Sequence, residues 1–248
     1  MELSAFFQEN PKAALAFSGG VDSAYLLYAA KQFGADVRAY YVKSAFQPRF
    51  ELEDARRLAK QLSASLRILT VDVLEDKVIA GNPCDRCYHC KKRIFEAVAR
   101  AAAEDGCQVL LDGTNASDEE GDRPGMRALK ELEVRSPLRE CGLTKEKIRE
   151  LSKEAGLFTW NKPAYACLAT RIPVGEQITH QKLRDTEAAE DYLFALGFTD
   201  FRVRRMGEAA RLQFPAGQLG EVLLRREEIV TALKQYYQMV LLDLEVRE

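Results

Sequence analysis

The stretch that most constrains the fold of this chain is AFSGGVDS, residues 16–23, which follows a short apolar run and opens a segment with apolar residues at helical spacing. Gly19 and Gly20 permit a tight turn and leave no side chain in the way of a ligand. The amides that follow, at the start of a helix, form a site for an anion such as phosphate. Ser18 and Ser23 add hydroxyl donors. We therefore expect nucleotide phosphates to bind here, the plain alternative being a strand-to-helix turn without a ligand.

Asp22 is the acidic residue of this loop. Its charge repels phosphate, so we expect it to orient the loop or to bind a magnesium ion. The whole hexapeptide after an apolar strand favours a nucleotide site over a bare Gly-Gly turn. The predicted ATP-binding residues of the loop are Ser18, Gly19, Gly20, Val21, Asp22 and Ser23.

Strand-like apolar runs alternate with amphipathic helical segments through the first part of the chain. Strands are predicted over residues 13–17, 36–42, 66–73 and 108–113, with a further short one over 134–138. Helices are predicted over residues 22–34, 50–63, 91–106 and 144–157, the last with Thr144 as its N-cap. This alternation predicts an α/β fold, a Rossmann-like parallel sheet covered by helices on both faces, for a first domain of residues 1–158.

The pattern changes in residues 157–177, which are irregular and carry two prolines. Beyond them, helices are predicted over residues 179–196 and 217–235, and strands over 200–205, 210–214 and 239–246. Such a run predicts a second, smaller α+β domain, residues 159–248, with an antiparallel sheet.

The chain of 248 residues has a formal net charge of -2, and 47% of it is hydrophobic. This balance is typical of a globular protein with a core, and it disfavours broad electrostatic capture of nucleic acid. No apolar run approaches the roughly 18 residues that a membrane helix needs, and no signal peptide is expected. We therefore expect a cytoplasmic protein, in which clustered cysteines more often bind metal or take part in sulfur chemistry than form disulfides.

Cys84, Cys87 and Cys90 fall within seven positions, and Cys167 lies in the irregular stretch downstream. Thiolates are the ligands of iron–sulfur clusters and of structural zinc. If a helix begins near residue 86, Cys87 and Cys90 share one of its faces, while Cys84 belongs to the loop before it. Three interpretations stay open: a cluster on the CxxC pair and a remote cysteine, a structural zinc site, and unligated thiols that include a single sacrificial cysteine.

Further polar residues stand where ligands commonly bind. Gly113 and Thr114 follow a predicted strand at the carboxyl edge of the sheet. Arg202 and Arg204 alternate, so on a strand both side chains face the same side, and such a pair suits a phosphate. For each pair the alternative is a capped turn or a solvated strand face. Other candidates for phosphate contacts are Lys91, Arg123 and Arg171.

At SGGVDS the sequence resembles the PP-loop ATP pyrophosphatases, whose signature is SGGxDS. Members cleave ATP between its α- and β-phosphates and typically adenylate an oxygen of the substrate. Further stretches look like the LarE family of ATP-dependent sulfur transferases, and the resemblance runs along nearly the whole chain. These stretches are NPCDRCYHCKKRIF (82–95), DGTNASDEEGDRPG (112–125), NKPAYACLATRIPVG (161–175) and FRVRRMGEAARLQFP (201–215).

The resemblance implies an enzyme that uses ATP and Mg²⁺ to adenylate a carboxylate of a pyridinium dicarboxylate mononucleotide. Sulfur then replaces AMP and leaves a thiocarboxylate, a step in nickel-pincer nucleotide cofactor biosynthesis. In one branch of the family the sulfur comes from the protein's own cysteine, and in another three cysteines hold a 4Fe-4S cluster. The CxxC pair favours the cluster branch, with Cys87, Cys90 and Cys167 as ligands and Cys84 as the alternative.

The resemblance also assigns roles to residues outside the cysteine stretch. It implies catalytic roles for Cys167, Asp22, Glu190 and Glu221. It implies substrate or phosphate contacts for Lys91, Arg123, Arg171, Arg202 and Arg204, and it adds Gly113 and Thr114 to the ATP site. We expect a small-molecule nucleotide substrate and a homo-oligomer, with the second domain serving substrate binding and assembly.

Other functions on the same fold are a tRNA thiolation enzyme and an ammonia-using, amide-forming synthetase with structural zinc. The first needs a basic RNA-binding surface or an added domain, and the near-neutral chain shows neither. A non-enzymatic alternative is a nucleotide-sensing module whose cluster reports redox state. The sulfur donor, the identity of the substrate and the oligomeric state are left open by the sequence.

Overall fold

The computed structural model of the protein describes residues 2–118 and 124–247. The chain forms two compact units: the first comprises residues 1–73 and 85–162, the second residues 74–84 and 163–248. The chain therefore passes from one unit to the other three times. The predicted division into domains 1–158 and 159–248 is a statement about independent folding, which the compact units do not test, and it remains a prediction.

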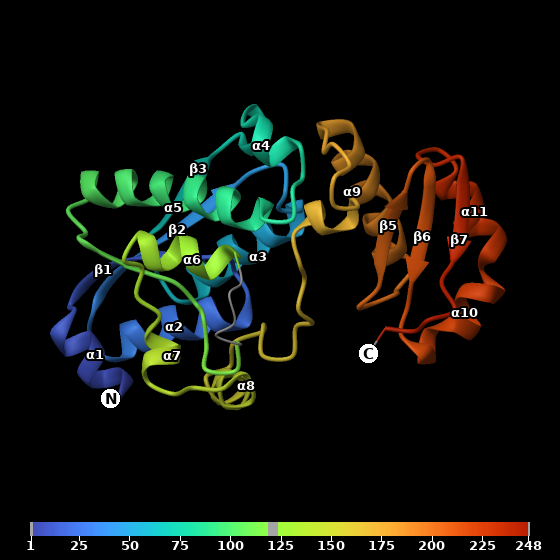
Figure 1. The fold of residues 1–248 in the computed structure, drawn as a ribbon. Helices are drawn as coiled ribbons and strands as arrows, with labels where there is room; N and C mark the ends of the chain where they lie inside the picture. Colours follow the sequence, from blue (N-terminus) through green and yellow to red (C-terminus); the bar gives the residue numbers. More distant parts are fainter. Residues whose placement is uncertain (1, 119–123, 248) are drawn as a thin grey trace. The chain divides into compact units, whose positions relative to one another are not determined.

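A four-stranded parallel sheet forms the centre of the first unit (Figure 1). Its strands are β1 (Lys12–Ala16), β2 (Asp36–Lys43), β3 (Leu66–Thr70) and β4 (Val109–Leu111). The order is β3-β2-β1-β4, and Ala13 of β1 pairs with Val37 on one side and with Val109 on the other. The predicted α/β fold with a Rossmann-like parallel sheet is confirmed.

Helices cover both faces of this sheet (Figure 1). Helix α5 covers one face, where Val98 and Ala102 pack against Ala14 and Tyr40 of the strands. Helices α1, α2, α3 and α8 surround the core of the other face, which includes Leu27. Burial on both faces explains why the strands are short continuous apolar runs. The helices are α1 (Leu3–Glu9), α2 (Val21–Gln32), α3 (Arg49–Gln61), α5 (Arg86–Glu104), α6 (Pro124–Glu131), α7 (Pro137–Glu140) and α8 (Lys145–Glu154).

The carboxyl end of β1 lies at a topological switch point. The chain leaves β1 through α2 toward β2, whereas β4 pairs with the opposite side of β1. Loops that follow β1 and β4 therefore diverge at this edge, which is where ligands bind in open α/β sheets. Gly19 follows β1 and Gly113 follows β4, so the fold brings the two predicted nucleotide segments to one edge of the sheet.

The second unit contains a three-stranded sheet with helices. Its elements are α4 (Lys77–Ala80), α9 (His180–Ala195), β5 (Arg202–Met206), β6 (Ala209–Gln213), α10 (Leu219–Leu224), α11 (Arg226–Leu233) and β7 (Met239–Leu242). Strands β5 and β6 form an antiparallel hairpin, but β7 runs parallel to β6. The prediction of an antiparallel sheet is therefore wrong for β7, because α10 and α11 return the chain before it pairs.

Two further predicted elements differ in the structure. Residues 134–138 form no strand: Arg135 makes a single bridge to Leu111, and Pro137 starts α7. Proline has no amide proton for a strand ladder but fits the first turn of a helix. The single helix predicted over 217–235 is interrupted at Arg225, where φ is -98° and ψ is 14°.

Residues 74–84 are tied to the rest of the second unit by Asn82. Its side chain is buried, and its Nδ2 donates to the carbonyl oxygens of Ile172 at 3.3 Å and Pro173 at 2.7 Å. The amide of Gly175 in turn donates to the carbonyl oxygen of Asn82 at 2.8 Å. One buried asparagine thus joins two stretches that are far apart in the sequence.

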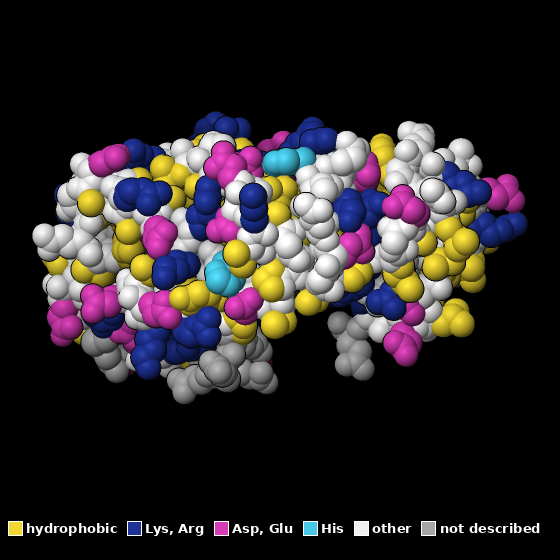
Figure 2. Space-filling model, turned by 45° about the horizontal axis from the view of Figure 1, so that its top comes forward, with side chains coloured by type: hydrophobic (Ala, Val, Ile, Leu, Met, Phe, Trp, Pro, Cys, Tyr) yellow, Lys and Arg dark blue, Asp and Glu magenta, His cyan; other side chains and the backbone are white. Residues whose placement is uncertain are grey.

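None of the helices in the described ranges has the length and apolar character needed to cross a membrane. Positive and negative side chains are interspersed over the face shown in Figure 2. This mixture agrees with the formal net charge of -2.

Candidate active site

The turn after β1 has a backbone shape that suits glycine. Gly19 has a φ of +74°, in the left-handed region. A Cβ at this position would lie 3.2 Å from the backbone nitrogen of Ala55 and 3.3 Å from its Cα. Ala55 belongs to α3 and is completely buried, so the contact would fall on backbone that has little room to move. Gly19 is therefore required both by the turn and by the close approach of α3.

Helix α2 begins directly after this turn, and its N-cap residue has no side chain with which to cap the first amides. Its N-cap, Gly20, makes no side-chain cap hydrogen bond, and the amides of a first helical turn have no carbonyl partner within the helix. The Ser18 hydroxyl accepts from the Gly20 amide at 3.3 Å and lies 3.2 Å from the Ser23 hydroxyl. Amide and hydroxyl donors are thus gathered in an arrangement that fits phosphate groups.

The segment after β4 approaches the same helix start. A Cβ on Gly113 would lie 3.0 Å from the amide nitrogen of Ser23, so any side chain here would crowd that amide. Thr114 is buried, and its hydroxyl donates to Asp112. The Asp112 carboxylate also accepts from the Ser136 hydroxyl at 2.7 Å. These hydrogen bonds hold the segment in place, and the missing side chain at Gly113 lets it lie close to the Ser23 amide.

Asp22, in the first turn of α2, has both carboxylate oxygens engaged. Lys145 Nζ lies 2.5 Å from Oδ2, and Asn115 Nδ2 donates to Oδ1 at 3.4 Å. Carboxylate oxygens are the ligands that Mg²⁺ prefers, and one beside a phosphate site can share an ion with the nucleotide. The residues at this edge therefore fit ATP with Mg²⁺, with Asp22 as the ligand that would hold the ion.

The predicted cysteine ligands are divided between the two units. Cys87 and Cys90 lie one turn apart at the start of α5 in the first unit, while Cys84 and Cys167 belong to the second unit. Cys84 and Cys87 are exposed, and the other two are half-buried. Within the described ranges no three Cys, His, Asp or Glu side chains gather into a group that could hold a metal ion. The thiols have the chemistry of cluster ligands, but the structure assembles no cluster site from them.

Lys91 follows Cys90 on α5 and lies against α6. A Cβ on Gly125 of α6 would come within 3.0 Å of Lys91 Cδ, so the stem of the lysine packs closely there. Arg123 lies outside the described residues. The phosphate contacts of both side chains remain predictions.

In the second unit, Arg171 and Glu190 form a buried ion pair. Their side chains are 1% and 2% exposed. Arg171 Nε donates to Glu190 Oε1 at 2.7 Å, the Val203 amide donates to the same oxygen at 3.0 Å, and the Tyr165 hydroxyl donates to Oε2. Burial lowers the pKa of Arg171, but the hydrogen bonds and charge of Glu190 outweigh it and leave that pKa above its ordinary value. Glu190 therefore positions Arg171 and carries its counter-charge.

Arg202 and Arg204 lie in β5, and both are anchored by carbonyl oxygens. Arg202 Nη2 donates to the carbonyl oxygen of Ala164 at 2.6 Å. Arg204 Nη1 donates to the carbonyl oxygen of Thr170 at 2.8 Å. Carbonyl oxygens carry no full charge, so these bonds orient the two guanidinium groups. Arg202 also pairs with a carboxylate, since its Nη1 lies 3.5 Å from Asp200 Oδ1.

Positive charge accumulates around these two arginines. Burial, together with the charges of Arg171 and Arg247, lowers the pKa of Arg202 to about 10. Burial, together with the charges of Arg171 and Arg211, also lowers the pKa of Arg204. Both shifts mean that the local environment disfavours the charged form of the side chain. An anion such as phosphate would relieve this imbalance. We call Arg171, Arg202, Arg204, Arg211 and Arg247 the arginine group.

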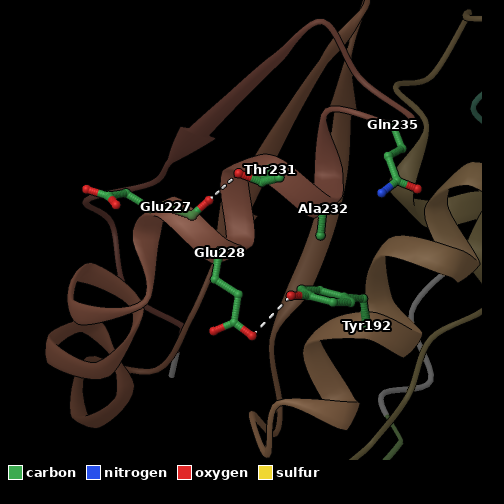
Figure 3. Close-up of a pocket in the computed structure, with 6 residues that line it drawn as sticks. All are labelled: Tyr192, Glu227, Glu228, Thr231, Ala232 and Gln235. Atoms are coloured by element: carbon green, nitrogen blue, oxygen red, sulfur yellow. Dashed lines mark hydrogen bonds between the residues drawn. The ribbon is translucent and has the colours of Figure 1, made fainter.

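Glu221 is exposed in the first turn of α10, and no hydrogen bond described above for the arginine group involves it. An open groove of about 460 Å³ lies elsewhere in the second unit, between α9 and α11 (Figure 3). There the hydroxyl of Tyr192 donates to Glu228 at 3.2 Å. None of the predicted site residues lines this groove, whose lining is Tyr192, Glu227, Glu228, Thr231, Ala232 and Gln235.

Three residues that contact the nucleotide loop or the arginine group from other helices and strands were not identified from the sequence. Lys145, which contacts Asp22, looks in the sequence like an ordinary exposed helix lysine. Arg211 pairs with Arg204 across the β5–β6 ladder, a relation that becomes visible only once the register is known. Arg247 lies near the end of the chain, where it bridges to Pro215 and pairs with Asp200 at 3.1 Å, a contact that local patterns do not predict.

The chain is similar to two other proteins along nearly its whole length. It is 35% identical over 245 residues to the pyridinium-3,5-bisthiocarboxylic acid mononucleotide synthase of Lactiplantibacillus plantarum, a match that covers 98% of this chain and 89% of that protein. An uncharacterized protein of Synechocystis sp. is 34% identical over 247 residues, covering 98% of this chain and 92% of its own length. Both matches therefore include both units.

Two further matches cover only part of the chain. The family described as "Queuosine biosynthesis protein QueC" matches residues 12–81, which include β1, the glycine turn and α2. A tRNA-specific 2-thiouridylase of Clostridium botulinum is 29% identical over 181 residues, covering 60% of this chain and 51% of that protein. The segment that holds the glycine turn is thus similar to a family named for another biosynthetic role.

Proposed function

Because the chain belongs to the LarE family of ATP-using sulfur transferases, we propose that it makes a thiocarboxylate from a carboxylate of a pyridinium dicarboxylate mononucleotide. This reaction is a step in nickel-pincer nucleotide cofactor biosynthesis. The observation that carries the proposal is the uncapped start of α2, which meets Gly113 at the switch point of the sheet. Backbone amides there suit the phosphates of ATP.

The reaction has two steps. In the first, a carboxylate oxygen of the substrate attacks the α-phosphorus, the bond from that phosphorus to the bridging oxygen breaks, and pyrophosphate leaves. In the second, sulfur bonds to the acyl carbon, the bond from carbon to the AMP oxygen breaks, and AMP leaves. The amides after Gly19 stabilise the charge that gathers on pyrophosphate. Asp22 would hold Mg²⁺, which would supply further positive charge beside the phosphates. Thr114 keeps the β4 loop in place.

The arginine group of the second unit is proposed to bind the phosphate of the mononucleotide substrate. Arg202 and Arg204 are held by carbonyl oxygens and have lowered pKa values, so they retain attraction for an anion. Glu190 keeps Arg171 in position through its buried carboxylate. Glu221 and Cys167 are proposed to act in the sulfur-transfer step, and Lys91 and Arg123 to contact phosphate.

We propose that Cys87, Cys90 and Cys167 would hold a 4Fe-4S cluster, with Cys84 as the alternative ligand. Such a cluster would supply the sulfide for the transfer step. The spacing of Cys87 and Cys90, one turn apart on α5, supports their acting together. The competing donor is the Cys167 thiol itself, consumed in a single turnover.

The function is tested by mixing the protein with ATP, Mg²⁺ and the pyridinium dicarboxylate mononucleotide, and by measuring pyrophosphate and AMP. We expect both to form only when the mononucleotide is present, and Asp22→Asn to abolish them. The matched control is Asp36→Asn, an exposed aspartate at the start of β2. Pyrophosphate release that ignores the mononucleotide but follows tRNA or ammonia would replace this function with tRNA thiolation or amide synthesis.

The sulfur source is tested by purifying the protein without oxygen and measuring iron and acid-labile sulfide. We expect both in the wild type and their loss in Cys87→Ala, Cys90→Ala and Cys167→Ala. Cys107→Ala, at a buried position beside the sheet, is the control and should keep the iron. A wild type without iron, whose Cys167 becomes dehydroalanine during turnover, would assign the sulfur to that cysteine instead.

Assembly into a homo-oligomer is proposed for the second unit. Large apolar side chains are exposed on it, including Leu224 at 80% and Leu244 at 86%. Light scattering on the purified protein should give a mass that is a multiple of 27.9 kDa. A mass of one chain at all concentrations would rule assembly out.

A further inference from the structure

Lys145 is the first residue of α8, and it reaches across to the nucleotide loop. Its Nζ lies 2.5 Å from Asp22 Oδ2, although the two residues are 123 positions apart. The lysine side chain is 35% exposed and that of Asp22 is 21% exposed. The contact is therefore open to solvent on one side, and neither group is locked into a dry core.

The position of this lysine is unfavourable for its own helix. A positive side chain in the first turn opposes the helix dipole, which favours negative charge there. The helix start is already capped, because the Thr144 hydroxyl accepts from the Lys147 amide at 3.3 Å. The Lys145 amide donates to the Ser117 hydroxyl at 2.9 Å, so the backbone is held while the long side chain can still turn. What Lys145 gains at this position is its contact with Asp22.

The same carboxylate is the one proposed to hold Mg²⁺. A magnesium ion on Asp22 Oδ2 would take the place of the ammonium group, because two cations repel each other at that distance. The phosphates bound at the start of α2, whose first turn carries Asp22, would then be new anionic partners for the displaced ammonium. Lysine binds phosphate as a point charge on a flexible stem, so this move needs only side-chain rotation.

We propose that Lys145 is a positioning residue of the nucleotide site that exchanges partners: it neutralises Asp22 when no nucleotide is bound, and it moves to the phosphates when Mg²⁺ takes the carboxylate. The inference rests on the proposed binding of ATP and Mg²⁺ at residues 18–23. It makes Lys145 both a competitor of Mg²⁺ for Asp22 and a ligand of the phosphates. Removing the ammonium group should therefore weaken nucleotide binding and strengthen the hold on Mg²⁺.

The test measures binding of α,β-methylene-ATP, which cannot be cleaved at the reacting bond, at a series of Mg²⁺ concentrations. For Lys145→Met we expect the affinity for the analogue at saturating Mg²⁺ to fall about tenfold or more, as for a lost charged hydrogen bond. The Mg²⁺ concentration for half-maximal binding should fall as well. Lys145→Arg, which keeps the charge, should recover part of the analogue affinity.

Lys147→Met is the matched control, because Lys147 lies on the same helix and pairs with Glu150 at 2.8 Å. It should bind the analogue as the wild type does. Equal binding and equal Mg²⁺ dependence in Lys145→Met and the wild type would overturn the inference, as would a variant that needs more Mg²⁺. A wild type that does not bind the analogue at all would instead contradict the proposed function, so the two failures are distinct.

Discussion

The glycine loop of the first unit and the arginine group of the second unit both suit phosphate, but they are built from different groups. The loop offers backbone amides around Gly19 and Gly20, and Gly113 approaches them closely because it has no side chain. The arginine group offers side chains whose charges exceed those of the nearby carboxylates, of which Glu190 is the most buried. The first site depends on the absence of side chains, and the second depends on their charge.

This difference teaches what each site can tolerate. A backbone site fails when an added Cβ occupies the space of the ligand, whatever the charge of the new side chain. A side-chain site fails when its charge balance changes, even if the volume stays the same. A substitution that changes only volume should therefore affect the glycine loop, and one that changes only charge should affect the arginine group.

The largest effect is expected from a change of charge without a change of volume in the second unit. Glu190→Gln leaves the buried Arg171 without its counter-charge, so the free energy of unfolding should fall by about 3–5 kcal/mol. Urea unfolding measures it. Glu227→Gln removes an exposed ion pair with Arg226 and should change that free energy by less than about 1 kcal/mol. Equal losses in the two variants would show that Arg171 does not depend on Glu190.

The next effect comes from adding one methyl group in the first unit. Gly113→Ala places a Cβ 3.0 Å from the Ser23 amide nitrogen, so the affinity for an ATP analogue should fall about a hundredfold through lost charged hydrogen bonds. Calorimetric titration measures it. Gly217→Ala, whose Cβ would have no neighbour within 4 Å, is the control. Unchanged analogue binding in Gly113→Ala would show that the phosphates do not use this amide.

A smaller effect is expected from Arg204→Gln. The affinity for inorganic phosphate, followed as a rise in melting temperature with phosphate concentration, should fall about tenfold with the lost charge. The surroundings lower the pKa of Arg204, so its charge is unfavourable in the folded protein when no anion is bound. Loss of that charge should therefore not destabilise the anion-free protein. Arg226→Gln, on the surface of α11, should behave as the wild type. If both variants respond equally, phosphate is bound elsewhere.

The smallest effect is expected on stability at low pH, from a charged residue of the first unit outside the glycine loop, Asp105. Hydrogen bonds from Arg38 and Tyr40 hold the pKa of Asp105 well below its ordinary value. The folded state therefore keeps this carboxylate charged at a pH where the unfolded chain already takes up a proton, and stability falls as pH drops. The stability lost in Asp105→Asn should be constant above about pH 4 and shrink below it.

Unfolding of the wild type and Asp105→Asn across this pH range measures the difference, with the exposed Asp36→Asn as the control. Analogue binding at neutral pH should be the same in all three proteins. A loss of binding in Asp105→Asn would mean that charge outside the loop matters to the nucleotide site, and the contrast between the two units would weaken.

The first unit was largely predictable because its site is local in sequence. The turn at Gly19 and Gly20 and the parallel sheet follow from short patterns of glycine and apolar residues, whereas the strand order was not predicted. The N-cap at Thr144 was also predicted and is confirmed. Lys145 could not be predicted, because its contact with Asp22 depends on how α8 packs beside α2.

The second unit was less predictable because its site is assembled across strands. The alternation of Arg202 and Arg204 was visible in the sequence, but the contribution of Arg211 depends on the register of β5 and β6. The parallel pairing of β7 depends on where the chain returns after α11. Long-range pairing and register are set by packing rather than by local pattern, and that limits what the sequence predicts.

The hydrogen bonds of Asn82 bear on how such a protein can be recombined with its relatives. A fragment that ends at residue 158 contains Asn82 but lacks Ile172, Pro173 and Gly175, so a buried amide loses its acceptors. A chimaera that takes its second unit from another family member must therefore exchange residues 74–84 together with the C-terminal stretch. The two gene segments that encode residues 74–84 and 163–248 must therefore remain compatible with each other.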